Sequence, residues 1–347
     1  MRARALLLPL LLLPLLGAQA PPPALPAAAQ VDDGPHVLWE AGKGRVLRWR
    51  QGKPEEAPLP PTGLLELEGL PPLRLSPVPP PPARAVFPAV ASLAAISDIH
   101  GRRDAMAALL KAQGIIDAKG AWAFGKGHLV VAGDLVDYGS QVTETVWMVR
   151  SLAAQAEAQG GAVHVLLGNH EVMDMRGDLR YLHPKYRALP LTTPFLMGPG
   201  TELGRWLRSL PAMIRIGDVL FTHGGPSAAF AQEHPGVDHV NALLRAELDG
   251  PRGAVTGGGG PQWYRGLVPG FSRKDATPAE VDQVLAGYGA ARVVVGHTTL
   301  ERVTAFFGGR VHVIDADFKE GKPGEVWLQI DGKRWRGTAD GRRFPLD

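Results

Sequence analysis

Polar side chains follow short apolar runs at five places along the chain, and this repeated pattern constrains the fold more than any other feature. In chain order the segments are Ser97-Asp98-Ile99-His100-Gly101, Gly133-Asp134-Leu135-Val136-Asp137-Tyr138-Gly139, Gly168-Asn169-His170-Glu171, Thr222-His223-Gly224-Gly225 and Gly296-His297-Thr298. Each apolar run is typical of a buried strand. Because the carboxyl ends of parallel strands meet at one edge of a sheet, the pattern predicts that these clusters share one cleft.

The side chains of these clusters form a ligand set for two hard divalent metal ions. Two ions about 3.5–4 Å apart need a bridging carboxylate and ligands from several strands. We assign Asp98 and His100 to the first ion, Asn169, His223 and His297 to the second, and Asp134 to the bridge. A lone His in an apolar run is more often a hydrogen-bonded core residue, so the prediction depends on all five clusters. We expect Mn, with Fe or Zn as alternatives, because these donors suit all three.

The order of apolar and helical patterns predicts the fold class. With 347 residues, 45% of them hydrophobic, the chain suits one large domain with appendages. Strands are expected at 90–96, 128–132, 163–167, 213–216, 219–222, 292–295, 303–307, 311–314 and 326–330, and helices at 104–113 and 144–159. We therefore predict an α/β (α+β) fold in which two mixed β-sheets pack as a sandwich flanked by helices, with the dimetal site at the strand ends.

The N-terminus predicts an exported protein. Residues 1–20 combine two arginines, a leucine-rich run and Ala18-Gln19-Ala20, as a cleavable signal peptide does. Pro9 and Pro14 interrupt the short apolar run, so we expect no stable membrane span. The alternative is an uncleaved anchor, because Pro21 follows the expected cleavage site. The chain has no cysteine, so it forms no disulfide, and we expect a bacterial periplasmic or secreted location.

The rest of the N-terminal region divides by composition. Residues 21–35 are a Pro/Ala-rich linker, 36–75 a small β-rich extension, 76–86 a proline-rich spacer, and 87–347 the main domain. In the extension, apolar stretches at 36–39 and 45–49, separated by Gly42-Lys43-Gly44, predict a hairpin. The extension is too short for an independent core, which favours a lid or a packing element over a separate binding module.

The net charge is too small to indicate a nucleic-acid partner. The formal charge is +3, and removal of Arg2 and Arg4 with the signal peptide leaves +1. We therefore expect a phosphorylated protein, a phosphorylated peptide or a small phosphoester as partner, and no nucleic acid.

The five motifs resemble those of the calcineurin-like metallophosphoesterase superfamily, over roughly residues 91–314, and within it the phosphoprotein phosphatase type. The runs Gly168-Asn169-His170-Glu171-Val172-Met173-Asp174-Met175-Arg176-Gly177-Asp178-Leu179-Arg180-Tyr181 and Trp263-Tyr264-Arg265-Gly266 are similar to the Shewanella-like phosphatases of bacteria, plants and protists. The resemblance implies that His170 protonates the leaving oxygen, that Asp137 orients His170, and that Arg265 binds phosphate. Asn169 and Tyr138 are expected beside the same phosphate.

The chain departs from the phosphatase motifs at two positions, Tyr138 and Asp174, and from the phosphodiesterase motif at Thr299. Tyr138 stands where the phosphatase motif has Arg, and a neutral phenol cannot replace a bidentate cation. Arg102, Arg103 or Arg176 could supply that charge, and Arg176 is our first choice because it follows His170 closely. Asp174 stands where the branch tends to have Asn. Thr299 replaces the last His of the phosphodiesterase Gly-His-x-His motif, which favours the phosphatase type.

Three functions remain open from the sequence. The first is an exported metal-dependent phosphomonoesterase that uses a hydroxide between the two metals, as a protein phosphatase on Ser/Thr or Tyr phosphate. The second is a periplasmic phosphatase for nucleotides or small phosphoesters, including a diadenosine-polyphosphate hydrolase. The third is a weakened phosphate-binding protein, which Tyr138 suggests and the general acid His170 argues against.

Overall fold

A computed structural model describes residues 31–346 of the chain. The predicted signal peptide and residues 21–30 of the predicted linker lie outside the described residues. Within residues 31–346, no helix combines the length and the apolar character that crossing a bilayer requires.

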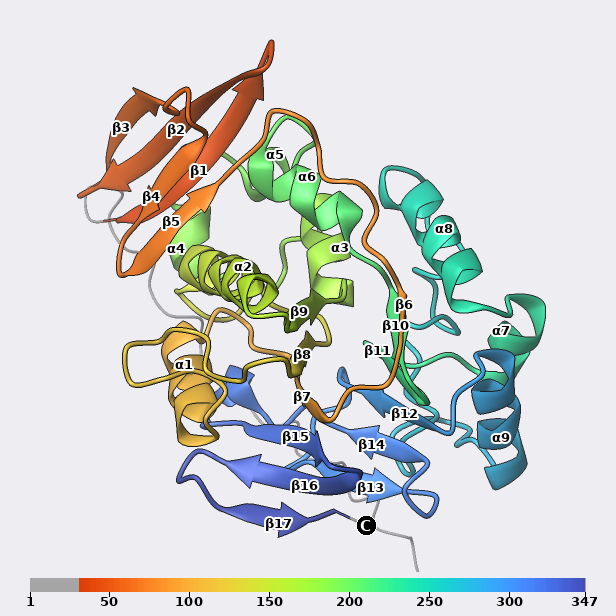
Figure 1. The fold of residues 1–347 in the computed structure, drawn as a ribbon. Helices are drawn as coiled ribbons and strands as arrows, with labels where there is room; N and C mark the ends of the chain where they lie inside the picture. The colour runs from red at the N-terminus through yellow and green to blue at the C-terminus, as the bar shows by residue number, and fades with distance from the viewer. Residues whose placement is uncertain (1–30, 347) are drawn as a thin grey trace, which may run out of the picture.

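Two six-stranded mixed sheets form the main domain (Figure 1). The first sheet has the order β17 (Arg343–Pro345), β16 (Lys333–Thr338), β15 (Glu325–Ile330), β7 (Ser92–Ile96), β8 (His128–Val131) and β9 (Ala162–Val165). The second has the order β13 (Thr304–Phe306), β14 (Val311–Val313), β12 (Arg292–Val295), β11 (Val219–Thr222), β10 (Met213–Ile216) and β6 (Val86–Phe87).

The two sheets pack against each other through large buried side chains. Trp327 on β15 contacts Phe221 on β11, with ring centroids 5.9 Å apart, and its indole N–H donates to His312 on β14 at 3.2 Å. All three side chains are almost fully buried. This shared core confirms the predicted fold class of two mixed sheets with flanking helices.

Helices flank both sheets. On one side lie α1 (Arg103–Ala112) and α2 (Val142–Ala158), beside β7–β9, and on the other lie α7 (Ala228–Glu233), α8 (Val237–Leu248) and α9 (Pro278–Gly287) (Figure 1). Shorter helices complete the domain, namely α3 (Asn169–Met175), α4 (Pro184–Arg187), α5 (Thr193–Leu196), α6 (Glu202–Ser209) and the 3₁₀ turn η2 (Phe318–Glu320). The sequence analysis predicted only α1 and α2 of these. Most of the others are short, but α8 was missed although its buried residues Val237, Val240, Leu244 and Leu248 follow a helical period.

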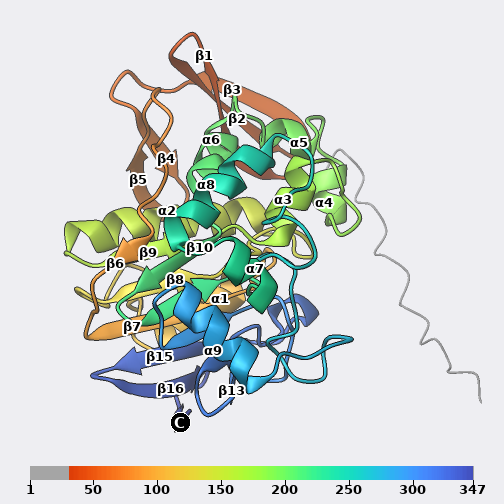
Figure 2. The same cartoon turned by 90° about the vertical axis from the view of Figure 1, so that its right-hand side faces the viewer.

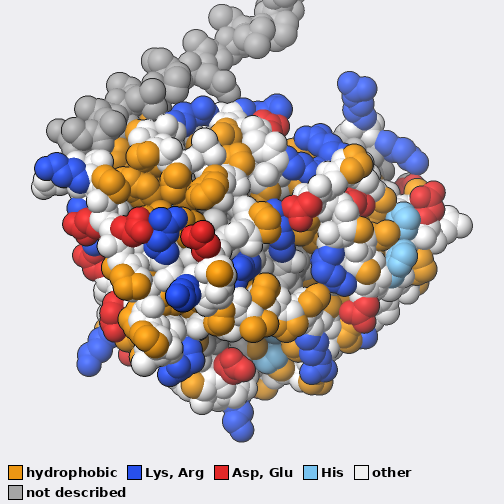
Figure 3. All heavy atoms as spheres, turned by 90° about the horizontal axis from the view of Figure 1, so that it is seen from above, with side chains coloured by type: hydrophobic (Ala, Val, Ile, Leu, Met, Phe, Trp, Pro, Cys, Tyr) orange, Lys and Arg blue, Asp and Glu red, His pale blue; other side chains and the backbone are white. Residues whose placement is uncertain are grey.

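The extension has more strands than the predicted hairpin. It contains β1 (Asp33–Glu40), β2 (Lys43–Arg50), β3 (Lys53–Pro58), β4 (Leu64–Leu67) and β5 (Leu70–Arg74), and lies at the opposite end of the molecule from β16 (Figure 2). The hairpin turn is Ala41-Gly42, both with positive φ, so Lys43 and Gly44 belong to β2 and not to the predicted turn. Seen from the extension, Lys, Arg, Asp and Glu side chains are interspersed over the surface (Figure 3).

The extension docks on the main domain by buried polar contacts. The indole of Trp147 on α2 donates to the Pro35 carbonyl at 2.9 Å, and that of Trp39 donates to Glu202 on α6 at 2.7 Å. Trp147 also joins the apolar core of the extension. These contacts make the extension a packing element of the main domain.

Two strands begin inside segments that were predicted to be a linker and a spacer. The linker was expected to end at residue 35, but β1 begins at Asp33, whose buried carboxylate bonds to His36. The spacer was expected to reach residue 86, but Ala83 donates to Ser209 and Val86 pairs with Arg215 on β10. In both places backbone pairing overrides the loop-like composition.

Candidate metal centre and active site

The ends of four central strands deliver the predicted ligands to one place. The strands β7 and β8 run parallel, as do β11 and β12, so within each pair the carboxyl ends point the same way. Asp98 and His100 follow β7, Asp134 follows β8, His223 follows β11 and His297 follows β12. The convergence is the one that the repeated strand-end pattern predicts.

The backbone at these strand ends is strained. Asp98, His100, Asp134, Asp137, Tyr138 and His297 all have φ between 48° and 69°. Non-glycine residues avoid this left-handed region, at a cost of order 1–3 kcal/mol each, and such residues cluster at functional sites. Hydrogen bonds between loops hold the conformation, including one from the Asp98 N–H to the Gly133 carbonyl at 3.1 Å.

Asp134 occupies the centre of the ligand set. Its Oδ2 lies 3.2 Å from Nε2 of His223 and 3.8 Å from Nε2 of His100. Asn169 Oδ1 lies 2.8 Å from the same His223 nitrogen. The structure therefore places Asp134 between the two predicted ligand groups, as a bridging carboxylate requires.

Backbone carbonyls orient the imidazoles toward this centre. Nδ1 of His100 lies 2.7 Å from the Val136 carbonyl, and Nδ1 of His223 lies 2.8 Å from the Ala132 carbonyl. Each of these histidines keeps Nε2 for a metal ion. Hydrogen bonding of the second ring nitrogen is the usual support of a histidine ligand.

His297 differs from His100 and His223 because its Nδ1, and not its Nε2, is free to bind a metal ion. Its Nε2 lies 3.2 Å from the Trp263 carbonyl, which leaves Nδ1 for the metal. With Asp134 and His223 it forms a group whose donor atoms lie within 4.8 Å of one another.

Several buried acidic side chains lie around the site, and bound divalent cations would balance their charge. Asp98, Asp134, Glu171 and Asp315 are each no more than 2% exposed. Burial, followed by the charge of Asp315, raises the pKa of Asp98 well above its ordinary value. Carboxylates crowded in a low-dielectric site require positive charge nearby, and oxygen and imidazole donors suit two hard divalent ions.

Asp98 has one carboxylate oxygen free to bind a metal ion. Its Oδ2 accepts hydrogen bonds from the Ser97 hydroxyl and the His297 N–H, while Oδ1 lies 3.9 Å from Nε2 of His100.

His170 and Asp137 form a hydrogen-bonded pair beside the centre. Nδ1 of His170 lies 2.5 Å from Oδ2 of Asp137, and its Nε2 lies 3.8 Å from Asp134 Oδ2. Burial disfavours the imidazolium, but the carboxylates of Asp134 and Asp137 outweigh it and raise the pKa of His170. The geometry also groups His170 with His100 and Asp134 as possible metal donors, so its role as acid stays a prediction.

Glu171 braces the site in a way that the sequence reasoning missed. Its carboxylate accepts backbone N–H bonds from Gly168 at 2.8 Å, Leu135 at 2.7 Å and Asp134 at 3.0 Å. It therefore ties the start of α3 to the loop that carries Asp134. A Glu three residues after a helix N-cap is a recognisable signal for this arrangement.

Two tyrosines border the pair. The rings of Tyr138 and Tyr181 stack with centroids 5.2 Å apart and 20° between planes, and Tyr181 lies 5.1 Å from the His170 ring. Burial raises the pKa of Tyr138, so its phenol remains a neutral donor. Tyr181 is 40% exposed and was not predicted as a site residue.

The predicted phosphate-binding arginines have different surroundings. Arg265 donates to the His297 carbonyl, which places it at the metal-binding loop. Arg176 donates to the carbonyls of Glu247 at 2.7 Å and Gly250 at 3.3 Å, at the end of α8. Both bonds come from Nη2 and direct the side chain toward the end of α8, and the role of Arg176 as the substitute for the missing arginine stays a prediction.

Lys319 supplies positive charge near the first ligand group. Its ammonium donates to Thr299 at 2.8 Å, and the Thr299 hydroxyl donates to Asp315 at 2.7 Å. Burial, with smaller contributions that include the charge of Lys319, lowers the pKa of His100 to about 3. Asp315 comes soon after the apolar strand β14, so the strand-end pattern could have revealed it.

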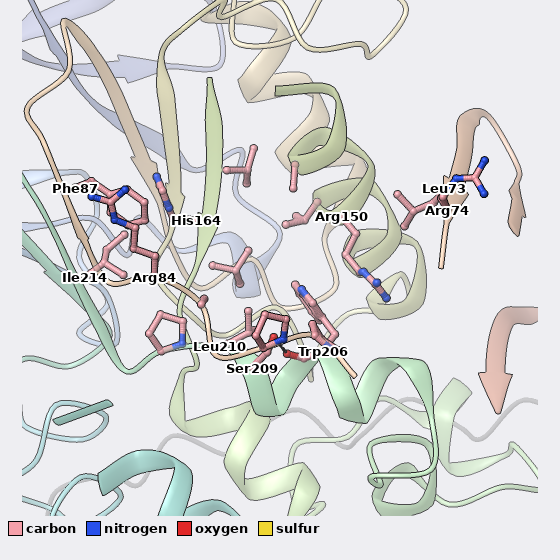
Figure 4. A pocket seen from close by; sticks show the side chains of 18 residues that line it. Leu73, Arg74, Arg84, Phe87, Arg150, His164, Trp206, Ser209, Leu210 and Ile214 are labelled. Atoms are coloured by element: carbon pink, nitrogen blue, oxygen red, sulfur yellow. Dashed lines mark hydrogen bonds between the residues drawn. The ribbon is translucent and has the colours of Figure 1, made fainter. Parts of the chain in front are cut away.

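A cavity of about 440 Å³ lies apart from these groups (Figure 4). Phe87, Arg150, His164, Trp206 and Leu210 are among its lining residues, and no aspartate, glutamate or asparagine lines it. It lacks the donors that hard cations need, so the metal site lies at the strand ends and not in this cavity.

Known proteins are similar to this chain in sequence or in fold. Shewanella-like protein phosphatase 2 of Arabidopsis thaliana is 24% identical over 258 residues, which cover 59% of this chain and 66% of the relative. The symmetrical bis(5'-nucleosyl)-tetraphosphatase of Vibrio vulnificus is 34% identical over 122 residues, 34% of this chain and 42% of the relative. The crystal structure of a cold-active protein-tyrosine phosphatase from a psychrophilic Shewanella species matches with a TM-score of 0.84 and 36% identity, covering 91% of this chain and 99% of that one.

A family model covers most of the main domain. Residues 91–300 match the calcineurin-like phosphoesterase family. This match agrees with the convergent ligand set at the strand ends, and it confirms the resemblance seen in the motifs. The chain belongs to the calcineurin-like phosphoesterase family of metal-binding hydrolases.

Proposed function

We propose that this protein is a metal-dependent phosphomonoesterase that acts on phosphotyrosine in proteins or peptides. The observation that carries the proposal is the His170–Asp137 pair, with Nδ1 and Oδ2 2.5 Å apart, beside the converging metal ligands. A proton donor at this place is needed for ester cleavage but not for phosphate binding.

The side chains divide the work of hydrolysis. Two bound divalent ions would polarise the phosphoryl group and lower the pKa of the attacking water. His170 donates a proton from Nε2 to the leaving oxygen, while Asp137 holds Nδ1 and fixes the ring. Arg265, next to His297, binds phosphate oxygens.

The monoester preference is supported at Thr299. This residue occupies the position of the second His in the phosphodiesterase motif, and its hydroxyl is engaged with Asp315 and Lys319. Lys319 adds a cation that would favour the dianion of a monoester over a diester monoanion.

The aromatic preference is supported by Tyr181 and Tyr138. The exposed ring of Tyr181 lies 5.1 Å from that of His170, where the leaving group of a substrate would be protonated. An aryl leaving group can stack there, while a serine or threonine side chain cannot. The name of the structurally similar Shewanella enzyme, a protein-tyrosine phosphatase, agrees with this preference.

A second candidate is a diadenosine-polyphosphate hydrolase. The Vibrio relative supports it, and a nucleobase could also stack on Tyr181. Steady-state kcat/KM on a phosphotyrosine peptide, the same peptide with phosphoserine, and diadenosine tetraphosphate separates the candidates. We expect the phosphotyrosine peptide to rank first; a higher kcat/KM for diadenosine tetraphosphate would overturn the proposal.

We further propose that the protein is exported from a bacterial cell. Residues 1–20 support export by their signal-like sequence. N-terminal sequencing of the protein recovered from the periplasm or the medium should give a chain that begins at Pro21. Recovery of the whole chain from the cytoplasm would contradict export.

A further inference from the structure

Asp174 lies one helical turn beyond His170 on α3. None of the roles described above involves this residue. Residues four apart on a helix share a face, so both side chains approach the Asp137 loop. Asp174 is 0% exposed. A buried carboxyl group this close to the catalytic pair needs a partner.

Within the described part of the chain, three carboxylate oxygens of Asp137 and Asp174 lack a hydrogen-bond donor. Both Asp174 oxygens and Oδ1 of Asp137 are buried, and within residues 31–346 no N–H or side-chain hydroxyl donates to any of them. Carboxylate oxygens only accept hydrogen bonds, so two ionised groups would leave all three unpaired. One proton on Asp174 gives the two carboxyl groups a hydrogen bond to share.

The surroundings of Asp174 favour that proton. Burial, and then the charges of Asp137 and Glu171, raise the pKa of Asp174 to about 9. The charge of Asp134 raises the pKa of Asp174 less than either of these carboxylates does. Neutralisation of Asp134 by bound metal would therefore remove only a minor cause of the raised pKa. A carboxyl group with a pKa raised this far keeps its proton at pH 7, and a protonated Asp174 has a hydrogen to donate to Asp137.

Other titratable groups face the same contact across a small cavity. His36 on β1 and Tyr186 on α4 line this cavity with Asp137 and Asp174. His36 is engaged with Asp33 at 2.6 Å, and the Tyr186 hydroxyl with the Ser140 carbonyl at 3.0 Å. Neither donates to Asp174, and no Lys or Arg lines the cavity.

We propose that Asp174 is a positioning residue that keeps a proton at neutral pH and donates a hydrogen bond to Oδ1 of Asp137. Asp137 then keeps Oδ2 on Nδ1 of His170, and its carboxylate is fixed from both sides. The effect on catalysis rests on the proposed phosphatase function, whereas the proton itself does not.

The kinetic test compares Asp174→Asn, which keeps a donor, with Asp174→Ala, which removes it. On a phosphotyrosine peptide we expect Asp174→Asn to keep kcat within about threefold of the original protein, and Asp174→Ala to lose at least about tenfold. On 2,4-dinitrophenyl phosphate, whose leaving group departs without protonation, the loss in Asp174→Ala should be smaller. Equal losses in both variants on both substrates would overturn the proposal.

An infrared difference spectrum tests the proton without using activity. The spectrum of the metal-loaded protein minus that of Asp174→Asn at pH 7 should show the carbonyl band of a protonated carboxylic acid. A carboxylate band in its place would overturn the proposal, even if Asp174→Ala fails to fold. Absence of all phosphoesterase activity would instead contradict the proposed function and leave the infrared result to decide on Asp174.

Discussion

Nδ1 of His170 lies 2.5 Å from Oδ2 of Asp137, and the two residues follow the neighbouring strands β9 and β8. His170 is in the first turn of α3, and Asp137 is in the loop after β8 with a φ of 69°. The imidazole therefore has one fixed orientation, with Nε2 left toward Asp134. This arrangement supports separate roles for metal ligands and proton donor.

Replacement of His170 by Asn should reduce turnover without removing the metals. A general acid contributes about 10²–10⁴-fold, and the contribution grows with the basicity of the leaving group. We expect a loss in that range on phosphotyrosine and a smaller loss on 2,4-dinitrophenyl phosphate, at unchanged metal content by elemental analysis. Loss of one metal equivalent would instead make His170 a ligand.

Replacement of Asp134 by Asn should abolish turnover through the metals. Asp134 is the carboxylate between His100 and His223, and an amide lacks the charge that a bridging ligand supplies. Metal analysis after dialysis should show fewer than two bound equivalents. Full metal content together with ordinary activity would exclude Asp134 as the bridge.

Removal of the Tyr181 ring should weaken binding of aryl phosphates. Stacking of an aromatic pair contributes about 0.5–1.5 kcal/mol, which corresponds to a KM about 2- to 12-fold higher for a phosphotyrosine peptide. The matched control is Tyr181→Phe, which keeps the ring and should keep the KM. An unchanged KM in Tyr181→Ala would show that the substrate does not stack there.

Replacement of Asp33 by Ala should loosen the extension. The carboxylate bonds to His36 at 2.6 Å and to Lys185 at 2.9 Å. Removal of one partner from a buried ion pair costs about 3 kcal/mol, to be measured by urea unfolding at pH 7. The exposed pair Arg45–Glu56 gives the control, since Arg45→Ala should cost less than about 1 kcal/mol.

The contribution of Asp33 should also depend on pH. Burial raises its pKa, but His36 and Lys185 outweigh burial, and the net pKa falls below 3.8. A group whose pKa is lowered by folding stabilises the protein above its unfolded pKa. The stability difference between the original protein and Asp33→Ala should therefore shrink as pH falls below about 3.8. A difference that is constant down to pH 2.5 would contradict this ionic role.

The sequence predicted the strands that lead to the metal site well. The bounds of β10, β11 and β12 agree with the prediction, because each is an apolar run that ends at a Gly or a polar cluster. The same pattern brought Asp98, Asp134 and the histidine ligands together.

Contacts between distant segments were not predictable in this way. The strand β16, Lys333–Thr338, has few apolar residues and depends on pairing with β15. Arg176 is near His170 in sequence, but as the residue after α3 its side chain reaches α8. Asp174 and Lys319 gain their surroundings only when α3 and η2 pack beside the strand ends.

The central claim is metal-dependent hydrolysis of phosphomonoesters at the Asp134 centre. The most direct measurement is the rate of p-nitrophenyl phosphate hydrolysis by the purified protein after chelation and after return of Mn²⁺, with bis(p-nitrophenyl) phosphate in parallel. We expect no turnover after chelation and restored turnover on the monoester in preference to the diester. Turnover that survives complete metal removal, or that favours the diester, would contradict the claim.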